Sequence, residues 1–207
     1  MKKIIVFAAV FFASILSFSQ NLSIESVCAD LSKNKITRGN FGQEKTIGKN
    51  GRVIKSFGEF IFAPEGIVWN TKKPFSSTLI LGEDYMIQMS SDGTKNVMDA
   101  KGNEVFKSIS STLLAVFSNH VSKLHENFNV VFRADSDKWW VTLEPKDSTV
   151  ASIMAGISLS GKSNSENTEI STVELNEAKG SKVSYTFFDQ SYPKELKSDE
   201  KILFDRK

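Results

Sequence analysis

Residues 38–81 constrain the fold more than any other part of the chain. The segment contains three runs rich in aromatic and β-branched residues, separated by Gly, Asn and Pro. Such runs between turn residues are typical of consecutive antiparallel strands. Phe60 and Phe62 share one face by the two-residue period of a strand, and beyond the turn at residues 63–66 Ile67 and Trp69 continue that face. We therefore expect a meander with one strongly aromatic face.

Residues 1–19 have the features of a signal peptide. The basic residues Lys2 and Lys3 precede an apolar run at residues 4–16, and small residues around Ser17 favour cleavage after Ser19. The alternative is an uncleaved membrane anchor, but the run is shorter than the ~20 apolar residues that a membrane span needs. We expect an exported protein in which residues 20–207 form one domain.

The charge balance argues against a nucleic-acid partner. Lys2 and Lys3 account for the whole formal net charge of +2, so residues 20–207 are electrically balanced. A surface that binds phosphates needs a cluster of basic residues. We therefore expect no nucleic acid among the partners.

The first element after the signal peptide is expected to be an amphipathic helix. Ile24, Val27, Cys28 and Leu31 follow the i, i+3, i+4, i+7 spacing of one helical face. Cys28 is the only cysteine, so it cannot form an internal disulfide. We expect its thiol to pack as a small apolar group.

Residues 99–125 change from the strand period to the helical period. Phe106, Ile109, Leu113 and Val121 recur at helical spacing, which predicts one helix or two short ones. Because strand-rich regions flank this segment, it must cover one face of the sheet. It either seals a closed core or forms a lid over a cavity.

Strand patterns return from residue 128 and continue through most of the chain that follows. Alternating apolar residues predict strands around 128–132, 138–143, 152–160, 172–175 and 183–187, with either a short helical turn or a direct connection at 147–153. Trp139 and Trp140 are adjacent, so only one of them can face the interior. The pattern predicts an α+β fold, in which helices cover one face of a curved antiparallel sheet.

The sequence contains no recognisable catalytic or metal-binding motif. His120 and His125 are five residues apart and point to different faces of a helix, which argues against a zinc pair or a base with its partner. A nucleophile elbow and a P-loop are both missing, and the carboxylates lie in solvated turns and strand faces. We expect a protein without catalytic residues, metal or cofactor, and a hydrolase is a distant alternative.

Several short motifs follow one another along the chain: Gly39-x-Phe41-x-Gln43, Gly58 before an apolar strand, Gly66-Ile-Val-Trp69, Lys73-Pro74 and a Leu-x-Pro strand end within residues 140–146. In order and spacing, this set resembles the periplasmic lipoprotein carrier family LolA. Residues 69–78 look closer to LolA-like members found with aryl polyene and glycolipid pathways than to the main lipoprotein carriers.

This resemblance implies an incomplete β-barrel with helices over its concave face as a lid. It also implies a monomeric periplasmic carrier that shelters the acyl chains of a lipoprotein, or of a related lipidic amphiphile, and moves them from the inner toward the outer membrane. An inner-membrane release transporter and an outer-membrane acceptor would be its partners.

We expect a hydrophobic cavity with ligand-binding residues from the strands and from the lid. Ligand contact and ordinary packing are equally open for each of these positions, and a non-catalytic periplasmic structural or interaction module with a closed core is the alternative function. The expected cavity residues are Phe41, Phe60, Phe62, Ile67, Trp69, Leu79, Leu81, Ile87, Met89, Leu113, Leu114 and Phe117.

One position departs from the family pattern. In the main carriers an arginine beside the turn between the second and third strands hydrogen-bonds the lid. The corresponding turn at residues 62–66 contains no arginine. Either the lid is held differently, or the transfer to an outer-membrane acceptor differs.

Overall fold

The computed structural model describes residues 22–48, 51–99 and 104–205, so the expected signal peptide lies outside the described residues. Within these ranges, eleven strands form one antiparallel sheet in the order β6-β5-β4-β3-β2-β1-β11-β10-β9-β8-β7. The strands are β1 (Thr37–Thr46), β2 (Val53–Ala63), β3 (Gly66–Lys73), β4 (Ser77–Leu81), β5 (Tyr85–Ser90), β6 (Lys95–Asp99), β7 (Phe128–Asp135), β8 (Lys138–Pro145), β9 (Met154–Ser163), β10 (Thr168–Glu177) and β11 (Lys182–Ser191).

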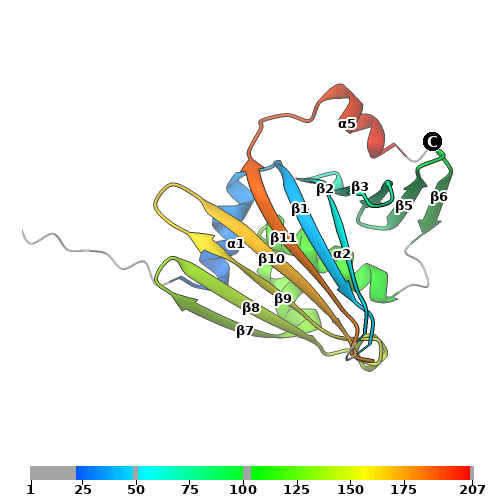
Figure 1. The fold of residues 1–207 in the computed structure, drawn as a ribbon. Coiled ribbons are helices and arrows are strands. Elements are labelled where there is room, and N and C mark those ends of the chain that lie inside the picture. Colours follow the sequence, from blue (N-terminus) through cyan, green and yellow to red (C-terminus); the bar gives the residue numbers. More distant parts are fainter. Residues whose placement is uncertain (1–21, 49–50, 100–103, 206–207) are drawn as a thin grey trace, which may run out of the picture.

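The helices of the described chain are short and lie on both faces of the sheet. They are α1 (Ile24–Lys33), α2 (Glu104–Phe117), α3 (Val121–Asn127), α4 (Ser148–Ala151) and α5 (Ser198–Leu203). Figure 1 shows the sheet curving in front of α1 and α2, with α5 set apart beside the ends of β1 and β11. The predicted α+β class and the helices at 24–33 and within 99–125 are confirmed, whereas β6 and α5 were not predicted.

The predicted meander is confirmed by its register. Phe60 pairs with Trp69 and Phe62 with Ile67 across the β2–β3 hairpin, so these four side chains share one face. We call this the inner face, because it packs against the helices α1, α2 and α3 in one buried cluster. The alternate residues, such as Val68, point to the outer face.

Two glycines allow aromatic rings to lie close to the backbone of the inner face. A β-carbon at Gly58 would lie 2.9 Å from Cε1 of Phe41, and one at Gly39 would lie 2.7 Å from Cε1 of Phe60. Each glycine pairs directly with the residue whose ring covers it. Glycines at such positions permit close approach and bending of the sheet.

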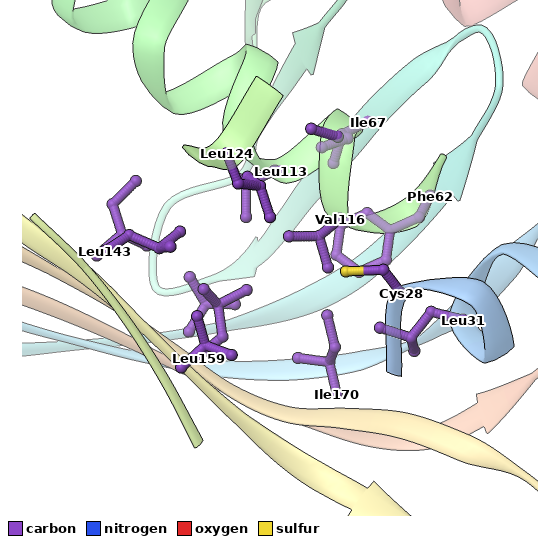
Figure 2. Close-up of a cluster of buried hydrophobic side chains, with 14 of the residues drawn as sticks. Cys28, Leu31, Phe62, Ile67, Leu113, Val116, Leu124, Leu143, Leu159 and Ile170 are labelled. Carbon is purple, nitrogen blue, oxygen red and sulfur yellow. The ribbon is translucent and has the colours of Figure 1, made fainter. Parts of the chain in front are cut away.

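The inner cluster extends from β2 and β3 across the sheet to β7 and β8. Figure 2 shows Leu143 and Leu159 of the sheet beside Leu113 and Leu124 of the helices. Trp139 is buried in this cluster, whereas Trp140 on the opposite face is 42% exposed. The prediction that only one tryptophan of this pair faces inward is confirmed.

Helix α1 has an N-terminal cap and, as its sequence predicts, one apolar face. Ser23 and Ser26 cap each other's backbone N–H groups at 3.2 and 3.0 Å, in a reciprocal capping box. Ile24, Val27 and Leu31 are buried together with Cys28. The predicted amphipathic helix is therefore confirmed.

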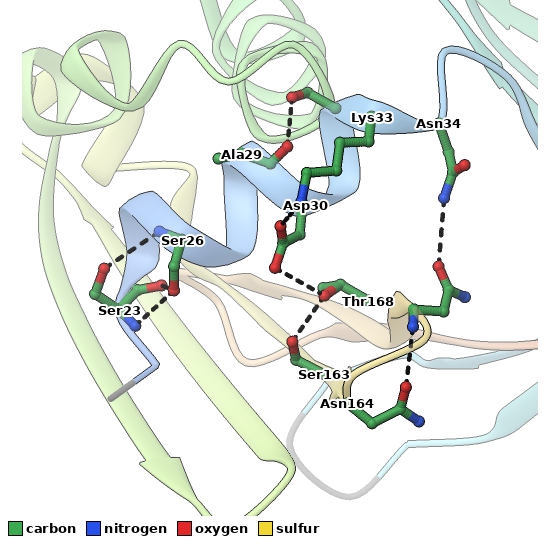
Figure 3. A network of polar contacts seen from close by, with 11 residues as sticks. Ser23, Ser26, Ala29, Asp30, Lys33, Asn34, Ser163, Asn164 and Thr168 are labelled. Atoms are coloured by element: carbon green, nitrogen blue, oxygen red, sulfur yellow. Dashed lines mark hydrogen bonds and ion pairs between the residues drawn. The ribbon is translucent and has the colours of Figure 1, made fainter. Parts of the chain in front are cut away.

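Polar contacts attach α1 to the β9–β10 hairpin, as Figure 3 shows. The amide of Asn34 donates to Oδ1 of Asn167 at 3.3 Å, and the hydroxyl of Thr168 donates to Asp30 at 3.5 Å. Asp30 also accepts a hydrogen bond from Lys33 at 2.6 Å. Since these contacts add to the buried face of α1, this helix is held to the sheet on two sides.

A partly buried ion pair holds α5 on the outer face. The guanidinium of Arg38 on β1 lies 2.5 Å from Glu200, and it also donates to the carbonyl oxygen of Glu195. Beneath α5, a second buried cluster contains Val68, Ile80 and Ile87. The outer face is therefore apolar where α5 covers it.

The different environments of Val141 and Val131 predict different costs for the same substitution. Val141 on β8 is buried in the inner cluster, while Val131 on β7 is half exposed on the outer face. Val141→Ala should lower the free energy of unfolding by about 2 kcal/mol, because it removes buried methyl groups and leaves a cavity. Val131→Ala should change it by less than about 0.5 kcal/mol. Urea denaturation followed by circular dichroism measures both; equal losses would contradict the assignment of the two faces.

Candidate functional site

Ten of the twelve predicted cavity residues lie together at the inner cluster. Seven of them are buried members of the cluster, and the other three are partly buried and pack against it. The seven are Phe41, Phe60, Phe62, Ile67, Trp69, Leu81 and Leu113, and the three are Leu79, Leu114 and Phe117.

The structure places Ile87 and Met89 elsewhere, and their assignment to the inner face was wrong. Both residues belong to the outer cluster beneath α5. In the β4–β5 hairpin Leu81 pairs with Met86 and Ile80 pairs with Ile87. Because paired residues share a face, Ile87 lies on the face of Ile80, and Met86 packs against the inner cluster instead.

Two further aromatic residues of the inner face come from β11. Phe187 lies 4.8 Å from Phe60 and 5.7 Å from Phe62 between ring centroids, and Tyr185 lies 5.6 Å from Trp69. The alternation of residues 183–187 indicated a strand, but only the pairing of β1 with β11 brings these rings to Phe41. Sequence reasoning therefore missed them as site residues.

Helix α2 closes one end of the aromatic face through Phe117. The ring of Phe117 stacks at a tilt against Phe62, with a centroid separation of 4.1 Å. Leu113 is buried beneath the helix, whereas Leu114 is only partly buried. Helix α2 therefore contributes Phe117 to the cluster of aromatic rings on the inner face, which we call the aromatic group.

Two pockets open where α2 ends beside the β2–β3 turn, and we call this end of the molecule the mouth. Leu114 lines both pockets. One has a volume of about 570 Å³ and the other of about 660 Å³. The smaller is lined by Phe62, Ile67, Leu114 and Phe117 together with polar residues from the end of α1 and from the α2–α3 turn, and the larger by Pro64, Glu65, Tyr85, Leu114, His120 and Lys123 among others.

A buried side-chain hydrogen bond joins α2 to the sheet beside the mouth. The hydroxyl of Ser110 donates to the carbonyl oxygen of Gly82, in the β4–β5 turn, at 2.8 Å. Ser110 is fully buried. Ser110 is therefore a specific polar contact between α2 and the sheet.

The aromatic group contains polar atoms that lack polar surroundings. The indole Nε1 of Trp69 is buried and has no hydrogen-bond partner within the described residues. Burial raises the pKa of Tyr185 to about 12, so its hydroxyl remains neutral. An unpaired buried N–H costs roughly 1–3 kcal/mol, and a carbonyl oxygen brought in by a ligand would remove that cost.

The two histidines lie in different surroundings. His120 lines the larger pocket, and the backbone carbonyl of His125 accepts a hydrogen bond from Lys146 at 2.6 Å. Among the described residues, no group of His, Cys, Asp and Glu side chains is arranged to hold a metal ion. Within the same residues, none of the helices has the length and apolar character needed to span a membrane.

Comparison with known proteins identifies one family. The family described as "Outer membrane lipoprotein carrier protein LolA" matches residues 32–201. A search of the curated proteins found no match.

Solved structures of similar fold are distant in sequence. A DUF1329 family protein from Desulfovibrio piger ATCC 29098 superposes with a TM-score of 0.50 at 6% identity, covering 88% of this chain and 95% of that one. A LolA superfamily protein from Nitrosomonas europaea gives a TM-score of 0.43 at 7% identity, with coverages of 86% and 96%. A domain described as outer membrane lipoprotein-sorting from Vibrio parahaemolyticus gives 0.49 at 7%, with coverages of 87% and 97%. The first of these likenesses, with a TM-score of 0.50, concerns the fold alone.

Cys28 should report whether the inner cluster is closed. Its side chain is fully buried near Phe62 and Val116 (Figure 2), and burial raises the pKa of its thiol to about 12. At pH 8 the native protein should therefore react with an aromatic disulfide reagent at least a hundredfold more slowly than the urea-unfolded protein, because both access and thiolate are lacking. Absorbance of the released thiolate measures the rate. Similar native and unfolded rates would show that the cluster is open.

Proposed function

The chain belongs to the LolA family of outer membrane lipoprotein carrier proteins, and from that membership we propose that it is a periplasmic carrier of acylated amphiphiles. It shelters the acyl chains of a lipoprotein, or of a glycolipid or aryl polyene lipid, between the inner face and α2. It acts as a monomer after removal of residues 1–19. An inner-membrane transporter loads it, and an outer-membrane acceptor receives the cargo.

One observation supports the proposal most directly. The aromatic inner face meets a covering helix at a mouth where Phe62, Leu114 and Phe117 line an unfilled pocket of about 570 Å³. Each CH₂ group of an acyl chain that leaves water contributes roughly 0.8 kcal/mol to the free energy of binding. A pocket that continues into apolar side chains therefore binds an acyl chain strongly. The polar residues around the pocket, including Lys35 and Asn119, suit the head of an amphiphile.

The buried state of most predicted cavity residues determines how cargo would enter. Phe41, Phe60 and Ile67 are almost fully buried, so the unloaded inner face is filled by its own side chains and by α2. Cargo enters when α2 moves away and its acyl chains replace the side chains of the lid on the aromatic face. The alternative, a closed structural core, requires α2 to remain fixed.

The hydrogen bond that joins α2 to the sheet is weak enough for a lid that opens. The buried side-chain bond from Ser110 to Gly82 contributes about 0.5–1.5 kcal/mol, which acyl burial readily exceeds. The turn at residues 62–66 lacks the arginine that hydrogen-bonds the lid in the main carriers. We propose that Ser110 holds the lid in its place.

Leu114→Glu should abolish acyl binding without unfolding the protein. Leu114 is partly buried and lines both mouth pockets, so a carboxylate there repels an alkyl chain but retains access to water. Titration of residues 20–207 with a fluorescent fatty acid should give a dissociation constant at least tenfold higher than that of the unchanged protein. Circular dichroism verifies the fold.

Ile202→Glu is the matched control for that experiment. Ile202 is exposed on α5 at the outer face, so its replacement should leave probe affinity unchanged. If neither the unchanged protein nor the control binds the probe, or if Leu114→Glu binds as they do, the carrier proposal is wrong.

Ser110→Ala should loosen the lid. Removal of the hydroxyl leaves the carbonyl of Gly82 without this donor, which shifts the equilibrium toward the open lid by a factor of roughly 2–10. The reaction rate of Cys28 with a thiol reagent under native conditions should rise by a similar factor. Ser111→Ala is the control, because the Ser111 hydroxyl bonds only within α2, to the carbonyl of Ser108. Equal rates for the two variants would show that Ser110 does not hold the lid.

A further inference from the structure

Large apolar side chains are exposed at the end of the sheet that lies opposite the mouth. Ile47 beside the β1–β2 turn is 50% exposed, and Ile153 before β9 is 53% exposed. Val53 and Ile54 at the start of β2 are exposed as well. Apolar groups gathered on a surface mark a site of interaction.

The segments that carry these residues are joined by hydrogen bonds, and we call this end of the sheet the hairpin end. The backbone N–H of Gly48 donates to the hydroxyl of Ser181 at 3.1 Å, which joins the β1–β2 and β10–β11 hairpins. The N–H of Ala178 donates to the carbonyl of Ile153 at 2.8 Å. In Figure 1 the tips of the labelled strands β1, β2, β10 and β11 converge at one end of the sheet, away from α5.

Basic residues lie in the same segments as the apolar residues of the hairpin end. Among the described residues of 44–55 and 174–182, five are basic and three are acidic. Lys55 and Lys182 pair with glutamates, whereas Lys45, Arg52 and Lys179 make no salt bridge with any described residue. The hairpin end is therefore positive, although residues 20–207 as a whole are balanced.

The β3–β4 connection adds a further apolar side chain at the same end of the sheet. Phe75 is 84% exposed, and it follows Lys72 and Lys73 closely in the chain. Lys73 pairs with Phe57 on β2, four residues from Val53. The mixture of exposed apolar groups and lysines thus continues beyond the two hairpins.

We propose that the hairpin end docks on the surface of an anionic phospholipid membrane. Protein interfaces are typically depleted in lysine, whereas aliphatic side chains among unpaired basic groups match a layer of anionic headgroups over acyl chains. The eleven residues of β2 separate Val53 at this end from Ala63 beside the mouth. The docked protein therefore keeps its mouth away from the membrane, free for cargo or a protein partner.

Vesicle sedimentation tests the proposal with residues 20–207 at low ionic strength. The unchanged protein should bind vesicles of mixed phosphatidylglycerol and phosphatidylcholine, and should not bind vesicles of phosphatidylcholine alone. Arg52→Glu should weaken binding by at least roughly fivefold, because it removes a cation and adds an anion near the headgroups. Ile47→Asn should weaken it by a similar factor through loss of apolar contact.

Matched controls lie away from the hairpin end. Lys162→Glu on β9 and Val131→Asn on β7 make the same kinds of change at exposed positions elsewhere, and both should bind vesicles as the unchanged protein does. Absence of binding to the anionic vesicles would overturn the proposal, as would equal losses in the hairpin-end and control variants. Because acyl-probe binding is measured separately, failure here leaves the carrier function untouched.

Discussion

The pairing register of the strands is the constraint on which the rest of this structure depends. Neighbouring residues of a strand point to opposite faces, so the register of each hairpin decides which side chains meet. The pairing of Phe60 with Trp69 and of Phe41 with Gly58 gathers aromatic rings on the inner face. A shift of one residue in β2 would send those rings to the outer face and leave the helices without a surface to cover.

The helices differ in how they are attached to that face. Helix α1 buries Val27 and Cys28 and also bonds through Asn34 to the β9–β10 hairpin. Helix α2 packs Leu113 and Phe117 on the aromatic group, with Ser110 as its side-chain bond to the sheet. An apolar contact is not directional, so an acyl chain can replace it. In the proposed function, α1 is therefore the scaffold and α2 is the movable cover.

The two ends of the long central strands have different chemistry. The mouth combines the polar residues of two turns with Phe62 and Leu114, whereas the hairpin end combines Ile47 and Ile153 with basic residues that make no ion pair within the described chain. The ends are separated by the length of β2, which is about 35 Å at 3.2–3.4 Å per residue. Under the two proposals made above, the protein would contact a membrane and exchange cargo at separate surfaces.

The sequence by itself determined the elements whose pattern is local. Helical and strand periods predict three such features. These are the capped apolar stripe of α1, the β2–β3 meander and the opposite orientations of Trp139 and Trp140. For the same reason, ten of the twelve residues that we expected to line a cavity share the inner cluster. Only the tertiary structure decided which face of β5 turns inward, because a two-residue period cannot distinguish the two faces, and so Ile87 was misplaced. The pairing of β1 with β11 likewise depends on contacts between distant segments, which no local pattern encodes. The same holds for the packing of α5 on the outer face.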